Sequence, residues 1–112
     1  MEKDYDYFFG EAAQLRNEKR IRDFAMYKSQ RVALDSYKKS KLAELMVEAQ
    51  RQNIKAIGNQ ESFAYSHPDY IALINGLQIA TRKETELQYQ LKMFEIEIEV
   101  WRTEQANNRK LM

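Results

Sequence analysis

Few side chains in this sequence could carry out catalysis. His67 is the only histidine, and cysteine is absent. A di-iron carboxylate centre in a helical bundle uses Glu-x-x-His pairs, but Ala64 stands three residues before His67. Neither a zinc ligand set nor a glycine-rich phosphate loop is present. We therefore predict a protein that is not an enzyme, with no catalytic residue, no bound metal and no cofactor.

Charged residues instead form two segments of opposite sign. Residues 16–41 carry nine basic and three acidic side chains, whereas residues 84–104 carry six glutamates and two basic side chains. A basic stripe can bind nucleic-acid phosphates, and Arg16, Lys19 and Arg20 are the candidate contacts. However, complementary charges on two paired helices can also neutralise each other and fix the register of the pair. We favour internal neutralisation and keep nucleic-acid binding as the alternative.

The segments that position these residues are predicted to be helical. From Glu11 to Gln52 the sequence contains no glycine or proline and is rich in strong helix formers. The sequence Ser66-His67-Pro68-Asp69 is typical of a helix start, with a capping serine and an acid three residues later. We predict an all-α fold, a long antiparallel helical hairpin in a single domain. It comprises an N-terminal segment (1–10), a first helix (11–52), a connector (53–66) and a second helix (67–109).

A hairpin with a symmetric connector has a predictable register. Reflecting the chain about residue 60 places residue 24 near residue 96. Glu84 then lies opposite Lys38 and Lys39, and we expect one of these lysines to pair with it. The apolar residues of the first helix cover a wide arc: Ile21, Phe24, Tyr27, Val32, Leu34, Leu42, Leu45, Met46 and Ala49.

The second helix has apolar residues on two opposite faces. One series, in which Glu84 is the charged member, has the spacing of a coiled-coil seam: Leu73, Leu77, Ala80, Leu87, Leu91, Phe94, Ile98 and Trp101. The second series lies on the other side: Tyr89, Met93, Ile96 and Val100. Residues 94–100 also alternate as a strand would, but the helical pattern before them favours a helix. Because one partner helix covers one face, the second series is the candidate oligomer interface, and we expect a homodimer that forms a four-helix bundle.

The N-terminal segment is unusually aromatic. Within residues 4–9 two aspartates accompany four aromatic residues: Tyr5, Tyr7, Phe8 and Phe9. These rings can cover the open end of the hairpin near Trp101. They can also anchor a partner protein, with Gly10 as a hinge. We take the four rings as the candidate partner contact.

The chain from Phe24 to Arg109 resembles a loose group of small phage-encoded helical-hairpin proteins. The similarity lies in a polar connector, in the sequence Trp-Arg-Thr at residues 101–103, and in spaced residues of the first helix: Tyr27, Ala33, Tyr37 and Ala43. The resemblance implies a helical hairpin of no established activity, encoded among phage genes for DNA recombination and replication. It implies no catalytic residues.

These observations together predict a non-enzymatic interaction protein, encoded by a phage or mobile element, that binds a host or phage protein. The alternative is an accessory factor in phage recombination or replication that binds nucleic acid through residues 16–41. The composition, 44% apolar and 31% charged, is that of a folded domain. No apolar run is long enough to cross a membrane, so we expect a cytoplasmic location and no membrane partner.

Overall fold

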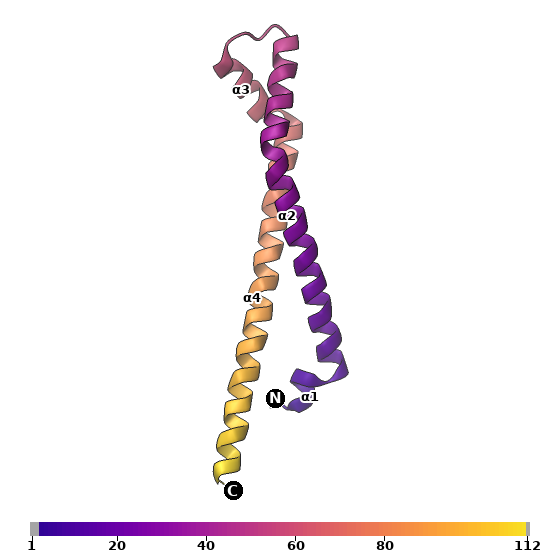
Figure 1. Cartoon of the computed structure of the whole chain (residues 1–112), viewed down its shortest axis with the longest axis vertical. Helices are drawn as coiled ribbons and strands as arrows, with labels where there is room; N and C mark the ends of the chain where they lie inside the picture. The colour runs from indigo at the N-terminus through magenta and orange to yellow at the C-terminus, as the bar shows by residue number, and fades with distance from the viewer. Residues whose placement is uncertain (1–2, 112) are drawn as a thin grey trace. The chain divides into compact units, whose positions relative to one another are not determined.

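The computed structural model describes residues 3–111, which form four helices and no strand (Figure 1). The helices are α1 (Tyr5–Phe9), α2 (Glu11–Arg51), α3 (Ile57–Ser66) and α4 (Pro68–Leu111). The predicted all-α fold with two long helices is confirmed. The bounds of α2 and α4 fall within two residues of the predicted ones.

The helices divide into two compact units. Unit 1 combines the described residues up to Met26 with those from Lys83 onward, and unit 2 comprises Tyr27–Arg82. Within each unit a segment of α2 pairs with an antiparallel segment of α4. Each unit therefore contains a pair of long helical segments and one short helix. The short helix is α1 in unit 1 and α3 in unit 2.

The seam predicted along α4 is confirmed. Ala80 is 2% exposed. The other members, including the charged Glu84, are half-buried: Leu73, Leu77, Leu87, Leu91, Phe94, Ile98 and Trp101. The steps of four and three residues keep one face of the helix toward its partner, as in a coiled coil. The inner face of α4 is thus occupied by packing within the chain.

The inner face of α2 is more polar than the sequence pattern suggests. Ile21 and Val32, which belong to the predicted apolar arc, are 51% and 53% exposed. Arg20, Arg31 and Lys38 are half-buried instead, because steps of three and four residues along the seam lead to these positions. Long basic side chains can lay their aliphatic stems on apolar neighbours while the charged ends reach water.

The register of the helical pairs differs from the predicted one. In unit 2 a β-carbon placed on Gly76 would lie 3.5 Å from Cδ1 of Leu34. In unit 1 the guanidinium carbon of Arg16 lies 6.0 Å from the centroid of the Phe94 ring. Reflection about residue 60 would instead pair Leu34 with residue 86 and Arg16 with residue 104. The observed partners, Gly76 and Phe94, each lie ten residues earlier in the chain than these predicted partners.

This register also removes the basis for pairing Glu84 with Lys38 or Lys39. In unit 1 residue 84 falls at the level of Met26 when the Arg16–Phe94 contact is extended along the two helices. Lys38 forms an ion pair on its own helix, with Nζ 3.2 Å from Oδ1 of Asp35.

The connector explains the shift in register. Ten of its residues form α3, which takes up about 15 Å at about 1.5 Å per residue. This helix runs back beside the end of α2 (Figure 1), and Nε2 of Gln50 donates a hydrogen bond to Oε1 of Gln60 at 3.4 Å. Consequently, α4 begins beside a part of α2 that is further from the C-terminal end of α2 than a short turn would allow.

The C-terminus of α2 is closed by a Schellman motif. Asn53 has a φ of 65° and follows the last turn of the helix. The N–H of Ile54 donates to the carbonyl of Ala49 at 3.0 Å, and the N–H of Asn53 donates to the carbonyl of Gln50 at 3.0 Å. Asparagine tolerates the left-handed conformation that this cap requires.

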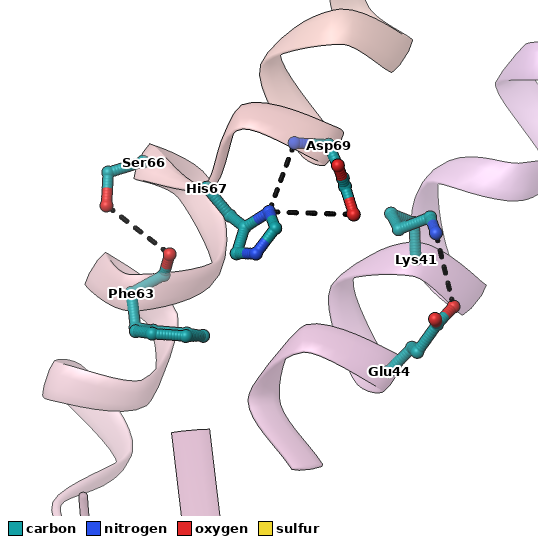
Figure 2. A network of polar contacts seen from close by, with 6 residues as sticks. All are labelled: Lys41, Glu44, Phe63, Ser66, His67 and Asp69. Carbon is teal, nitrogen blue, oxygen red and sulfur yellow. Dashed lines mark hydrogen bonds and ion pairs between the residues drawn. The ribbon is translucent and has the colours of Figure 1, made fainter. Parts of the chain in front are cut away.

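The junction between α3 and α4 uses His67 as its cap (Figure 2). The backbone N–H of Asp69 donates to Nδ1 of His67 at 3.0 Å, and Oδ2 of Asp69 lies 3.8 Å from the same nitrogen. Ser66 Oγ instead donates to the carbonyls of Ser62 at 2.7 Å and Phe63 at 3.3 Å. The prediction that Ser66 caps the second helix is therefore wrong, because its hydroxyl binds the last turn of α3.

Candidate interaction surface

Two shallow hollows on unit 1 bring together residues of the candidate partner contact, the candidate oligomer interface and the candidate nucleic-acid contact. The first is lined by Phe8 from the aromatic segment and by Ile96 and Val100 from the second apolar series. The second is lined by members of all three sets: Tyr7, Arg16, Arg20 and Met93. The candidate partner contact, oligomer interface and nucleic-acid contact thus adjoin one another, although they are distant in sequence.

The outer stripe is an exposed apolar surface of unit 1. We use this name for Tyr89, Met93, Ile96 and Val100, which are 69%, 54%, 39% and 52% exposed. At 100° per residue they lie opposite the seam that packs on α2. Large contiguous patches of exposed apolar side chains are often sites of association. The residues that the sequence assigned to an interface are therefore on the surface and available for contact.

Charged residues border the outer stripe on both sides. Lys92 and Glu99 lie along one border, whereas Lys83, Glu97 and Glu104 lie along the other. Lys92 and Lys83 each form an ion pair three residues along α4, with N–O distances of 3.8 and 3.7 Å. Both lysine side chains are well exposed, at 64% and 44%. Exposed pairs of this kind contribute little energy and rearrange readily.

The aromatic segment forms the short helix α1. Its N-cap is Asp4, whose Oδ1 accepts a hydrogen bond from the N–H of Tyr7 at 3.1 Å. Phe8 is 4% exposed, and its ring centroid lies 5.7 Å from that of Trp101 and 6.0 Å from that of Phe94. Packing near Trp101, one of the two roles considered for these rings, is thus observed.

This packing limits which aromatic residues a partner could reach. Phe8 is covered and Phe9 is half-buried, with its centroid 5.9 Å from that of Trp101. Tyr5 and Tyr7 are 62% and 38% exposed. While α1 stays in place, the predicted partner contact reduces to these two tyrosines.

A glycine is required at position 10 because the carbonyl of Asp6 approaches this residue closely. A β-carbon at this position would lie 2.5 Å from the carbonyl oxygen of Asp6. The N–H of Gly10 donates to that same oxygen at 2.9 Å and closes α1. The glycine therefore permits the tight exit from α1, in addition to any hinge motion.

The basic residues proposed for nucleic-acid contact do not all face water. The guanidinium carbon of Arg16 lies 5.9 Å from the Tyr7 ring centroid and 6.0 Å from that of Phe94. Arg20 is half-buried beside the same hollow, whereas Lys19 is exposed. Arg16 is thus engaged with two aromatic rings of unit 1 although it is exposed, and Arg20 is partly covered.

Sequence reasoning missed Gln60, the buried polar residue of unit 2. It is 4% exposed, and its Nε2 donates to the carbonyls of Ile54 at 2.9 Å and Lys55 at 3.3 Å. These bonds fasten α3 to the loop that follows α2. A glutamine within a polar segment gives no signal of burial, because its partners are backbone carbonyls whose positions depend on the fold.

Comparison with known proteins adds no family assignment. No protein-family model, curated protein or solved structure matches this chain. The resemblance to phage-encoded helical hairpins therefore rests on the sequence pattern alone. Within residues 3–111, no cluster of three or more histidine, aspartate or glutamate side chains could hold a metal ion. In the same range, no helix has both the length and the apolar character needed to cross a membrane.

Proposed function

We propose that this chain is a non-enzymatic interaction protein that forms a homodimer through the outer stripe. The observation that carries the proposal is the exposure of Met93 and Val100, at 54% and 52%, on a helix whose opposite face already packs on α2. Removing such apolar surface from water is the main driving force of protein association.

The small area of the outer stripe limits the affinity of the proposed homodimer. Specific, stable interfaces bury about 1,200–2,000 Å², and four half-exposed side chains per chain supply only part of that area. Association must also offset the loss of translational and rotational freedom. We therefore expect a dimer with a dissociation constant in the micromolar range or weaker.

We also propose that a partner protein binds at α1. Tyr5 and Tyr7 are the aromatic residues that stay accessible there, and tyrosines are frequent anchors of interfaces. Nucleic-acid binding through residues 16–41 has less support, since Arg16 lies over two aromatic rings and Arg20 is half-buried.

A matched pair of variants tests the homodimer. Met93 in the outer stripe and Val32 on α2 have nearly equal exposure, 54% and 53%. By light scattering after gel filtration, we expect Met93→Lys to shift the protein to monomer at concentrations where the unmodified chain and Val32→Lys are dimeric. Equal dimer strength in both variants would exclude the outer stripe as the interface.

A further inference from the structure

We infer that the two copies pair through α4 in antiparallel orientation, with Met93 of one copy opposite Ile96 of the other. The inference rests on the proposed homodimer and adds its orientation and register. It follows from the spacing of the outer stripe and from the charges along its two borders.

The spacing of the outer stripe is compatible with a two-fold axis that relates the α4 helices of two copies. Its members follow steps of four, three and four residues, so they take successive seam positions of a coiled coil. An axis between Met93 and Ile96 brings each of them opposite the other. The same axis brings Tyr89 opposite Val100. All four apolar residues of each copy are then covered by the four of the other.

The first border of the outer stripe becomes complementary in this register. Lys92 precedes Met93 and Glu99 precedes Val100, and residues at these equivalent positions meet across an antiparallel pair. Lys92 of each copy then lies opposite Glu99 of the other. Lys92 is free to turn toward this partner, because its present contact with Glu95 is an exposed pair at 3.8 Å.

The second border is complementary as well. Lys83 lies opposite Glu104 of the second copy, and its side chain is 44% exposed. Glu97 lies opposite Gln90, so no acid meets an acid there. Glu97 keeps its own contact, with Oε2 3.3 Å from Nζ of Lys3. By symmetry, the antiparallel register brings four lysine–glutamate pairs together.

A parallel pair would be less favourable. In that orientation Lys92 would lie beside Glu97 of the second copy, but Glu99 would lie beside Glu104. The attraction of the first pair would be offset by the repulsion of the second. Exposed pairs contribute little to affinity, whereas they do discriminate between orientations of one interface. The charge pattern therefore selects the antiparallel dimer.

Disulfide trapping tests the orientation directly, because the natural chain contains no cysteine. A disulfide requires two Cα atoms within about 7 Å. The antiparallel register brings residue 89 of one copy to residue 100 of the other, and it separates the two copies of residue 89 by about 16 Å. We expect an oxidised mixture of the Tyr89→Cys and Val100→Cys proteins to yield the mixed disulfide. Tyr89→Cys alone should yield no more disulfide than the exposed control Val32→Cys.

The possible outcomes distinguish a failure of the antiparallel orientation from a failure of the homodimer itself. If the unmodified chain is dimeric and Tyr89→Cys cross-links to itself, the dimer is parallel and the inference is overturned alone. The inference also fails if the chain is dimeric and the mixture gives no mixed disulfide. A chain that stays monomeric overturns the homodimer as well. As a second arm, Lys92→Glu should weaken the dimer several-fold, and adding Glu99→Lys should restore it.

Discussion

Phe8 and Trp101 come from opposite ends of the chain, and their ring centroids lie 5.7 Å apart in unit 1. A helix as short as α1, with five residues, does not persist in water without tertiary contacts. The contact between these rings therefore holds α1 in place. Trp101 is the only tryptophan, so its fluorescence reports whether α1 is docked.

Replacing Phe8 by alanine is expected to release α1. Loss of a buried phenylalanine costs about 3 kcal/mol of the free energy of unfolding, and Trp101 becomes more exposed to water. We predict a red shift of Trp101 emission and a lower denaturation midpoint in urea. Leu15→Ala is the control, since Leu15 is 58% exposed on α2 of the same unit. A Phe8→Ala protein with unchanged emission would show that α1 does not depend on this ring.

Gly10→Ala tests the tight exit from α1. The added β-carbon would lie 2.5 Å from the backbone oxygen of Asp6, and a backbone atom cannot move aside as a side chain can. We expect α1 to shift and the free energy of unfolding to fall by about 1 kcal/mol or more. Gly58→Ala is the matched control, because a β-carbon there meets nothing within 4 Å. Equal stability of the two variants would contradict the close approach at Gly10.

His67 is expected to act through its capping nitrogen. His67→Ala removes the acceptor for the N–H of Asp69, and loss of an N-cap costs about 1 kcal/mol. His67→Asn supplies a side-chain oxygen that can accept the same hydrogen bond, so we expect it to retain most of the stability in urea unfolding followed by circular dichroism. If both variants lose stability equally, the contact of the His67 ring with Phe63, 5.8 Å away, is the interaction that matters.

The two long helices and the two faces of α4 could be predicted from this sequence because both depend on local spacing. The seam through Leu87 and Leu91 and the outer stripe through Met93 follow directly from steps of three and four residues. The helical state of residues 94–100, despite their alternation, follows from the uninterrupted pattern before them.

The register and the caps could not be predicted, since each depends on contacts distant in sequence. The shift that places Phe94 beside Arg16 arises from α3, whose burial of Gln60 depends on carbonyls of the preceding loop. Ser66 and His67 are both plausible caps, and the choice between them depends on which carbonyls the end of α3 leaves within reach. The polar seam of α2 could not be predicted from the positions of the apolar residues, because long basic side chains occupy part of the inner face.

Nucleic-acid binding is expected to be weak. Arg16 is engaged with the Tyr7 and Phe94 rings, so short DNA duplexes should bind no more tightly than roughly 10⁻⁴–10⁻⁶ M at physiological salt. Fluorescence anisotropy with labelled DNA measures this. Nanomolar binding that is lost when Arg16, Lys19 and Arg20 are all replaced by alanine, with helicity preserved, would establish the basic segment as a nucleic-acid site.

Self-association through α4 is tested most directly by the mass of the unmodified chain in solution as a function of concentration. Sedimentation equilibrium from micromolar to about 1 mM covers the range in which weak association is detected. The outer stripe predicts a reversible rise from 13.4 kDa to twice that mass, without larger species. A constant mass of 13.4 kDa across the whole range would contradict self-association through α4.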